Sequence, residues 1–462
     1  MGKFTGHTIT SDSALGDAKI QRSLRFNDDD SAYLNRTPSS AGNRKTFTFS
    51  CWVKRGNLGG SNKHIFAIQI DSSNQFVIRF VNTDKLQIYD YQSASHQLIF
   101  TTDVLYRDVS AWYHIVLAVD TTQSTNTDRF KLYVNGSQVT DFGTATYPSQ
   151  NHDTLVNTTN AHYIGQKNSS LYFDGYLAEF HFVDGYQYDP SYFGFTDPVT
   201  NIWMPKRYEG IHGTNGYYLD FSDNSSAAAL GIDKSLNGND FTVNNISVSA
   251  GTGDDSSLDT PSNNLATLNS LVKDSQTTLS NGNLQAAGSQ TSTYNINTQG
   301  NFVASSGKWY YEVEFTSGSG SCAVGWIRTT LNHDDNPTLG GGIIYRPTSG
   351  DYLDLAGNNP TTPPTTSTGT VIQVAIDLDA GKIWFGSGGT YFESGNPSTG
   401  ANAAMTFTGG AELLTPVVRT LGCTFKFNFG QRAFSYAVPT DFKTLCSNNI
   451  PINTPPIIRP QK

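Results

Sequence analysis

Residues 46–53 read TFTFSCWV, and their pattern decides the fold class of the chain. The apolar members stand at every second position: Phe47, Phe49, Cys51 and Val53. Successive side chains of a β-strand point to opposite faces of its sheet, so this period predicts a strand with one buried face. One buried and one wetter face is typical of antiparallel sandwiches, whereas strands of parallel α/β sheets are apolar throughout.

The pattern continues outward along the first half of the chain. Residues 113–119 are apolar in succession, as expected of a central strand that is covered on both sides. Phe130 and Leu132 alternate with polar neighbours until the chain reaches Asn135 and Gly136. An Asn-Gly pair between alternating runs predicts a hairpin turn, because both turn positions need a positive φ.

The second half repeats the alternation in residues 311–315, 372–378 and 425–429. Helical periodicity is nearly absent, and its best candidate is the stretch from Asn264 to Lys273. The predicted fold class is therefore all-β, with two antiparallel β-sandwich (jelly-roll) domains in series and a polar connector between them. The predicted segments are an N-terminal arm suited to docking (1–20), the first sandwich (21–200), a partly ordered connector (201–300), the second sandwich (301–447) and a Pro-rich extended tail (448–462).

The composition excludes several classes of function. The chain has 462 residues, of which 12% are aromatic and 15% are charged. Its formal net charge is −9 and it contains no basic block, so we expect no binding to nucleic acid. No stretch approaches the roughly 18 apolar residues of a membrane span, which predicts no membrane insertion. The first residues lack the apolar core of a signal peptide.

The cysteines are too few for a disulfide framework and lack the spacing of a zinc site: they are Cys51, Cys322, Cys423 and Cys446. Cys51 and Cys423 lie within strand-like runs, where the expected role is that of a small buried side chain. A bridge between Cys322 and Cys423 stays open as an alternative.

Two groups of aromatic residues are candidates for binding a glycan. The first is Tyr89, Tyr91 and His96, and the second is Tyr186, Tyr188 and Tyr192. Exposed aromatic rings mark binding surfaces, but in a chain so rich in aromatic residues many rings belong to the core. Docking of another protein is equally compatible with both groups.

We predict no cofactor and keep one alternative, a calcium ion. Its candidate ligands are loop carboxylates: Asp28, Asp29, Asp30, Asp120 and Asp128. Ca²⁺ prefers carboxylate and carbonyl oxygens, yet the sequence contains no D-x-D-x-D-G loop. The preference of Asp for turns explains these residues equally well.

Glycan hydrolysis would need two carboxylates that flank the scissile bond, and Glu312 and Glu314 share one strand face at about 6.5–7 Å. The E-x-D-x-x-E pattern of jelly-roll glycanases would require a third carboxylate where this chain has Ser317. The sequence has no G-x-S-x-G nucleophile elbow, and His114 inside its apolar strand is expected to be a satisfied core histidine. No catalytic residue is therefore assigned.

Two sets of motifs resemble known domain families. Those of the first half resemble a laminin G-like, concanavalin A-like jelly roll: SLRF at 23–26, AYL at 32–34, WYHIV at 112–116, LYVNG at 132–136 and FDGYLAEF at 173–180. Those of the second half resemble a SPRY domain: GKWYYEV at 307–313, AVGW at 323–326, IDLD at 376–379, GKIWF at 381–385 and FNFGQ at 427–431. Their pairing, with GTNGYYLDF at 213–221 and LNGNDF at 236–241 between them, is similar to virion proteins of marine tailed bacteriophages.

This resemblance, rather than the strand pattern, implies a non-enzymatic structural protein of a tail fibre or other surface appendage. Such a protein serves assembly and recognises a glycan or receptor on the host surface. The resemblance also implies other virion proteins as partners, a homo-oligomer, and a place on the virion surface after synthesis in the bacterial cytoplasm. Two alternatives stay open: a capsular-polysaccharide depolymerase, and a capsid decoration protein without a ligand.

Overall fold

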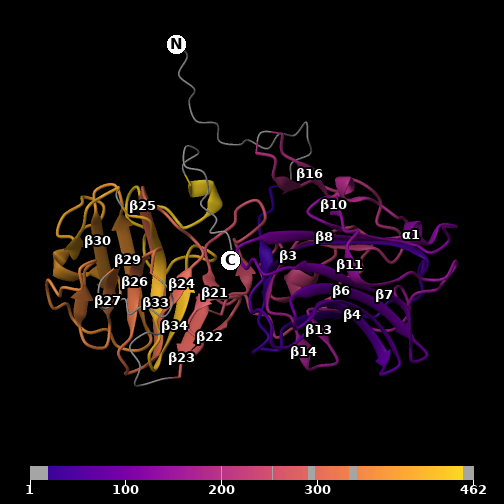
Figure 1. The fold of residues 1–462 in the computed structure, drawn as a ribbon, viewed down its shortest axis with the longest axis horizontal. Helices are drawn as coiled ribbons and strands as arrows, with labels where there is room; N and C mark the ends of the chain where they lie inside the picture. The colour runs from indigo at the N-terminus through magenta and orange to yellow at the C-terminus, as the bar shows by residue number, and fades with distance from the viewer. Residues whose placement is uncertain are drawn as a thin grey trace, which may run out of the picture.

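The computed structural model describes residues 19–450 except 199, 252, 290–296, 332–340 and 411. Two β-sandwiches lie side by side, the first coloured indigo to magenta and the second orange to yellow (Figure 1). Each has its own core of buried apolar side chains, which confirms the predicted fold class. The predicted N-terminal arm and Pro-rich tail lie almost wholly outside the described residues.

The first sandwich consists of two antiparallel sheets. The first sheet has the order β10 (Ser137–Gln138), β9 (Phe130–Val134), β8 (Trp112–Asp120), β3 (Thr46–Arg55), β15 (Gly175–Asp184), β1 (Ser23–Phe26) and β20 (Ser256–Ser257), and β18 (Tyr217–Leu219) also pairs with β15. The second sheet has the order β11 (Phe142–Thr146), β7 (Ser95–Leu105), β6 (Lys85–Gln92), β5 (Asn74–Phe80), β4 (Lys63–Asp71), β12 (His162–Ile164), β2 (Tyr33–Arg36) and β19 (Thr242–Asn244). Two hairpins and three short helices lie outside these sheets: β13 (Gln166–Lys167) with β14 (Leu171–Tyr172), β16 (Gly194–Thr196) with β17 (Trp203–Pro205), α1 (Asn126–Arg129), η1 (Pro190–Tyr192) and η2 (Ala228–Gly231).

The second sandwich is also antiparallel. One sheet has the order β21 (Leu268–Lys273), β24 (Thr298–Gly300), β33 (Leu414–Arg419), β26 (Ala323–Arg328), β27 (Gly342–Arg346) and β28 (Asp351–Leu353). The other has the order β22 (Thr277–Ser280), β23 (Gln285–Gly288), β34 (Cys423–Asn428), β25 (Lys308–Gly318), β29 (Thr370–Asp377), β30 (Lys382–Ser387) and β31 (Thr390–Tyr391), and β32 (Met405–Thr406) also pairs with β30. Two short helices accompany them in the described ranges, η4 (Phe392–Ser394) and η5 (Ser447–Asn449).

The alternating stretch forms β3, a central strand of the first sheet. Phe47 and Phe49 are 1% exposed, and their rings contact Phe76 and Phe66 of the second sheet. Between β9 and β10 the backbone turns with φ of 49° and 78° at the predicted Asn-Gly pair, which confirms the hairpin. The alternation of apolar residues therefore predicts correctly which side chains of this strand face the core.

Residues 201–300, predicted as a connector, supply strands to both sandwiches. β18, β19 and β20 extend the sheets of the first sandwich, whereas β21 to β24 belong to the second. Strands this short show too few alternating positions to stand out in a sequence rich in Ser, Asn and Thr. The two domains are therefore joined directly at about residue 260, without a separate segment between them.

The helix candidate from Asn264 to Lys273 is wrong, because Leu268–Lys273 is β21. Leu268 is 0% exposed and pairs with Gly300 of β24, whereas Leu271 is 39% exposed. The spacing of the leucines therefore does not mark one buried helix face. Pairing with a neighbouring strand decides the conformation here, as it often does for short segments of weak intrinsic preference.

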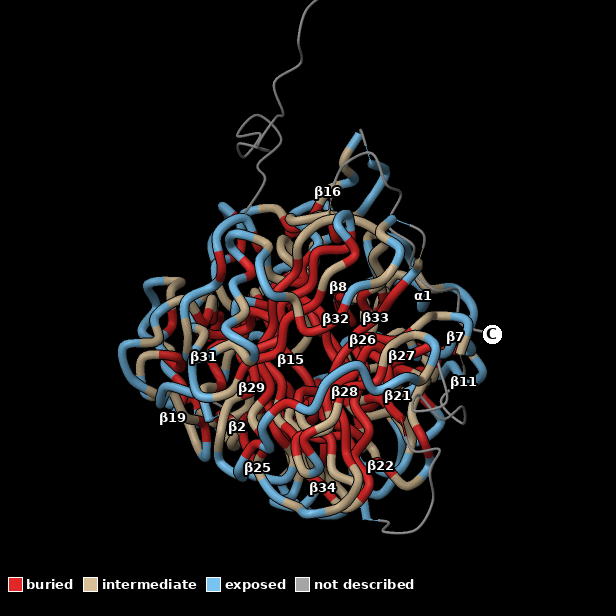
Figure 2. The backbone as a smooth tube through the Cα atoms, turned by 90° about the vertical axis from the view of Figure 1, so that its left-hand side faces the viewer, coloured by how far each residue is buried: buried red, intermediate tan, exposed pale blue. Residues whose placement is uncertain are grey.

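The outer face of the first sheet is covered by the chain itself. Three side chains of β3 point away from the core of the sandwich, yet each is at most 3% exposed: Ser50, Trp52 and Lys54. The β16–β17 hairpin packs on this face so closely that an added Cβ at Gly136 would lie 2.5 Å from the Trp203 ring. Buried residues, drawn red in Figure 2, fill the interior of the molecule, and exposed residues in pale blue lie around the rim. This covered face supports the site described below.

All the cysteines are buried free thiols. The Cys423 thiol donates to the Gly320 carbonyl at 3.8 Å, and the disulfide left open between Cys322 and Cys423 is not formed. Among the helices in the described ranges, none has the length and apolar character that a membrane crossing requires.

Candidate functional site

Three tyrosines form a stacked row on the surface of the first sandwich, which we call the tyrosine ladder: Tyr186, Tyr188 and Tyr192. The ring centroids of Tyr186 and Tyr188 lie 5.5 Å apart at an interplanar angle of 2°. Those of Tyr188 and Tyr192 lie 4.2 Å apart at 27°. The outer rings, Tyr186 and Tyr192, are 39% and 44% exposed. The structure thus brings one predicted group together with its rings open to solvent, and its role in binding stays a prediction.

The tyrosine ladder is fixed by the strand beneath it. The Thr48 hydroxyl of β3 donates to the Tyr186 carbonyl and accepts from the Tyr188 amide, both at 2.8 Å. Asp189 then caps η1 by accepting from the Ser191 amide, and this turn brings Tyr192 back onto Tyr188. Because the rings are already held in place, a ligand that stacks on them costs little further ordering of the protein.

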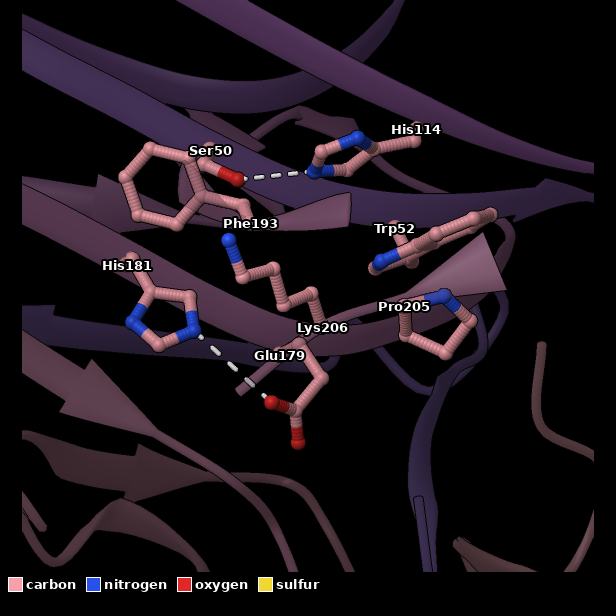
Figure 3. Close-up of a pocket in the computed structure, with 8 residues that line it drawn as sticks. All are labelled: Ser50, Trp52, His114, Glu179, His181, Phe193, Pro205 and Lys206. Carbon is pink, nitrogen blue, oxygen red and sulfur yellow. Dashed lines mark hydrogen bonds and ion pairs between the residues drawn. The ribbon is translucent and has the colours of Figure 1, made fainter. Parts of the chain in front are cut away.

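Behind the ladder, ring contacts lead to a hollow between the first sheet and the β16–β17 hairpin (Figure 3). Tyr188 contacts Tyr208 at 6.1 Å, and Tyr208 contacts Phe193 at 4.9 Å between centroids. The hollow is lined by Ser50, Trp52, His114, Glu179, His181, Phe193, Pro205 and Lys206. It leaves almost no free space between its lining atoms, far less than the roughly 300–1,000 Å³ of sites that enclose a small-molecule ligand. These residues therefore support the ladder rather than enclose a sugar.

His114 in this hollow is a satisfied core histidine, as the sequence predicts. The Trp203 indole N–H donates to His114 Nδ1 at 3.0 Å. An indole only donates, so the ring proton lies on Nε2, which donates to Ser50 Oγ at 2.9 Å. Burial lowers the pKa of His114 to about 3, and nearby His181 adds to this effect. Ser50 is thus an acceptor and not a nucleophile activated by a base.

Glu179 occupies a β-bulge in β15 with a φ of 48°, a value that few non-glycine residues adopt. The register with β3 shifts between Ala178 and His181, which turns the Glu179 side chain into the hollow. Its two carboxylate oxygens accept from the Tyr218 hydroxyl at 2.9 and 2.8 Å, and His181 Nε2 lies 3.7 Å away. Burial and this carboxylate raise the pKa of Tyr218 far above its usual value, so its hydroxyl remains a donor.

Sequence reasoning missed Glu179 and Thr48. A signal for the bulge was present, since the buried residues Leu177 and Phe180 are three positions apart where regular alternation requires two. Thr48 gave no signal, because an outward Thr in an alternating strand is ordinarily solvated. Its burial depends on residues 186–193, which fold back over β3.

The other predicted aromatic group lies on the outer face of the second sheet. The His96 ring lies 5.4 Å from Tyr89 and 4.8 Å from Tyr91 between centroids. Tyr89 is only 6% exposed, its hydroxyl donates to Gln75, and the Arg79 guanidinium covers its ring at 5.1 Å. This group therefore offers Tyr91 and His96 to a ligand, but not the face of Tyr89.

The candidate calcium ligands do not share one site. Asp28 and Asp128 each pair with a lysine, and Asp120 accepts hydrogen bonds from residues of its own turn. Asp29 and Asp30 are exposed residues of another turn. Within the described ranges, no three or more side chains of the metal-binding types converge. Calcium binding stays a prediction without an assembled site.

The two carboxylates considered for glycan hydrolysis, Glu312 and Glu314, differ in how far they are buried. Glu312 is 3% exposed, whereas Glu314 is half-buried. The Glu312 carboxylate accepts from the Tyr310 hydroxyl at 2.9 Å and from the amides of Ser435 and Tyr436 at 2.8 and 2.9 Å. These hydrogen bonds hold the segment that follows β34 against the outer face of β25. With three donors and almost no exposure, Glu312 has no face for a sugar.

Glu312→Ala is expected to lower the free energy of unfolding by about 2–3 kcal/mol, because two amides and a hydroxyl lose a charged acceptor. Urea denaturation measures this loss. Glu314→Ala is the matched control on the same strand face and is expected to change stability by less than about 1 kcal/mol. Equal losses in the two variants would contradict the structural role of Glu312.

Two family models match the chain. Residues 27–186 match the concanavalin A-like lectin/glucanases superfamily, and residues 308–432 match the SPRY domain. The chain therefore carries a concanavalin A-like domain and a SPRY domain in series. No curated protein matches it.

Three solved structures are similar to parts of the chain. The SPRY domain of human HERC1 is 18% identical, with a TM-score of 0.26, over 33% of this chain and 91% of that one. The TRIM65 PSpry domain is 17% identical, with a TM-score of 0.28, over 36% and 89%. A "putative carbohydrate binding protein" from Bacteroides ovatus ATCC 8483 is 16% identical, with a TM-score of 0.31, over 49% and 59%.

Proposed function

For a chain that joins a concanavalin A-like domain to a SPRY domain, we propose the function of a non-enzymatic recognition protein whose tyrosine ladder binds a glycan on a host surface. The domain pairing supports the coarser statement, a ligand-binding or recognition module. The resemblance of its motifs to virion proteins supports the finer one, a component of a bacteriophage tail fibre or other surface appendage.

One observation carries the glycan-binding proposal, namely the two outer rings of the ladder. The C–H face of a pyranose packs on an aromatic ring, and a tyrosine adds a hydroxyl that bonds sugar hydroxyls. Stacking fixes the spacing of Tyr186 and Tyr192, and Thr48 fixes the backbone that carries the ladder. A rigid row of rings therefore suits successive residues of an oligosaccharide better than a single monosaccharide.

Tyr186→Ala and Tyr192→Ala are each expected to weaken glycan binding by about tenfold, which corresponds to the roughly 1.4 kcal/mol of one lost ring contact. A glycan array of bacterial surface oligosaccharides would identify the ligand, and calorimetry with that oligosaccharide would give the affinity of each variant. Tyr172→Ala, a half-buried tyrosine in β14, is the control and should leave the affinity unchanged.

Two outcomes would overturn the ladder as a binding site: no oligosaccharide bound at all, or equal affinity in Tyr192→Ala and the unaltered protein. Release of reducing ends from a host polysaccharide would instead favour the depolymerase. The structural role of Glu312 and the acceptor role of Ser50 speak against that enzyme. Imaging virions with this chain labelled tests the appendage.

A further inference from the structure

Basic side chains gather on the outer face of the second sheet, on the opposite side of the sandwich from the tyrosine ladder. His64 of β4 pairs with Arg79 of β5, and Arg79 pairs with Gln87 of β6, so these three stand in one cross-strand row. Lys167 belongs to the β13–β14 hairpin, which lies beside β4 (Figure 1). The Arg79 charge adds to burial in lowering the pKa of Lys167.

Among the described residues, no carboxylate forms an ion pair with either cation. Arg79 donates through Nε and Nη2 to the amide oxygen of Gln87 at 3.0 and 2.7 Å, which leaves its Nη1 edge without a hydrogen bond to any residue that the structure describes. The Tyr89 phenol raises the pKa of Arg79, but no carboxylate in the described part of the chain raises the pKa of Arg79 or Lys167. In a chain with 39 acidic and 30 basic residues, two neighbouring cations without an acid form a local attraction for anions.

Two polar groups on this face also lack partners. His64 is 0% exposed, and neither ring nitrogen reaches hydrogen-bond geometry within the described residues, although the Asn62 carbonyl flanks the ring. The Gln69 Oε1 atom on the same strand is buried and unpartnered among the described residues. Because these side-chain atoms are buried, they lie beneath the face and do not themselves contact a ligand on it.

The next rows across this face are apolar and aromatic. Ala67 and Val77 form a closed floor with Tyr89, and Ile99 packs against it. Tyr91 and His96 continue the face toward the β6–β7 turn. On this sheet face, the apolar strip therefore lies between the two cations at one end and the rings of Tyr91 and His96 at the other.

We propose that this face binds a carboxylate- or sulfate-bearing saccharide, with Arg79 and Lys167 holding the anionic group and Tyr91 and His96 packing on a sugar ring. A guanidinium with one free edge is suited to a planar carboxylate or a sulfate, because it presents two N–H donors in a fixed fork. The inference deepens the proposed recognition of glycans by naming an acidic class of sugar and a second site for it.

The test uses the full chain with a hexasaccharide of mannuronate, a sulfated dextran oligosaccharide, neutral maltohexaose and inorganic sulfate, each titrated by calorimetry. We expect both acidic saccharides to bind and to weaken as salt screens the charges, whereas the neutral sugar and sulfate alone bind at least tenfold more weakly. Arg79→Gln and Lys167→Gln should each reduce the affinity for the acidic saccharides at least tenfold. Lys85→Gln, which removes a lysine of β6 already paired with Asp103, is the control and should leave it unchanged.

Unchanged affinity in both Arg79→Gln and Lys167→Gln would overturn the inference, and so would equal affinity for acidic and neutral saccharides. Lys167 is half-buried in a peripheral hairpin, so its variant is informative even where Arg79→Gln lowers stability. Tyr192→Ala separates the two sites. Acidic binding that is lost only in Tyr192→Ala would assign it to the ladder, and loss only in the two charge variants would leave the ladder without support.

Discussion

Asp259→Ala is expected to lower the free energy of unfolding by about 3–5 kcal/mol, because it leaves a buried ammonium without its counter-charge. Lys54 Nζ lies 2.7 Å from Asp259 Oδ2, and both side chains are 0% exposed. The ammonium also donates to Asn264 Oδ1 at 2.8 Å and to the Leu265 carbonyl at 2.9 Å. Without the Asp259 carboxylate, the buried Lys54 ammonium keeps only two neutral acceptors, and water does not reach it to replace the lost charge.

The same carboxylate joins the two domains. Its Oδ1 accepts from the Trp112 indole at 3.1 Å and from the Leu265 amide at 3.2 Å. Burial raises the pKa of Asp259, and the Lys54 charge opposes that rise. Asp259 follows β20 of the first sandwich, and Leu265 leads into β21 of the second. Loss of this carboxylate therefore loosens the junction as well as the ion pair.

Urea denaturation of the variant measures the effect, and the exposed pair of Lys85 and Asp103 supplies the control. These two groups lie 2.9 Å apart with side chains 29% and 45% exposed, so Asp103→Ala should cost less than about 1 kcal/mol. The double variant Lys54→Met with Asp259→Leu should recover part of the loss, because it removes both buried charges together but leaves the Trp112 and Leu265 N–H donors without their acceptor. A loss in Asp259→Ala no larger than in Asp103→Ala would mean that this pair does not hold the junction.

The sequence carried enough information for long strands and for clusters that are close in sequence. β3, β25 and β29 show six or more alternating positions each, so their buried faces could be predicted. Tyr186 and Tyr188 are two residues apart in an extended segment, so they share a side, and Tyr91 and His96 flank one turn. These relations depend on local geometry alone.

The unpredicted features depend on contacts between distant segments. The strands within residues 217–300 are defined by their partners more than by their own patterns. Thr48 acquires its role from residues 186–188, which are far away in sequence. Likewise, the row from His64 to Arg79 requires the register of β4 with β5, which contains bulges that no alternation count reveals.

Lowering the pH from 7 to 5 is expected to remove on the order of 4 kcal/mol of stability from the first sandwich. Burial is the main cause that lowers the pKa of His64, His114 and His212 to about 3 and that of His162 to about 4. In the unfolded chain these rings titrate near their ordinary value of about 6.5. Between the two values the unfolded state binds more protons, so the stability that they contribute is complete above about pH 6.5 and is lost as the pH falls.

Three carboxyl groups act in the opposite direction, because burial raises the pKa of Asp174, Asp255 and Asp259. Burial, together with the charge of Asp28, raises the pKa of Asp174 to about 6, so its contribution to stability grows as the pH falls from about 6 toward 4. Asp174 offsets about 1–2 kcal/mol of the loss at pH 5 and Asp255 and Asp259 add to this offset, whereas each of the four histidines costs about 2 kcal/mol there. The net effect of acid is therefore destabilising.

The hydrogen bonds explain why the rings do not take up the proton within the fold. His114 Nδ1 accepts from the Trp203 indole, and His162 Nε2 accepts from the Asn157 amide at 3.2 Å. A proton on either atom would place two donors against each other in a dry interior. Protonation must therefore follow the opening of the structure.

Urea titrations at pH 7, 6 and 5, followed by tryptophan fluorescence, measure this dependence, and equal midpoints at pH 7 and 5 would contradict it. His114→Gln has no proton to gain and should reduce the pH-dependent loss by about 2 kcal/mol, whatever its stability at pH 7. His114 also lies in the hollow behind the tyrosine ladder, where its Trp203 contact holds the β16–β17 hairpin against the sheet. Glycan binding by the ladder should therefore fail over the same pH range in which the first sandwich opens.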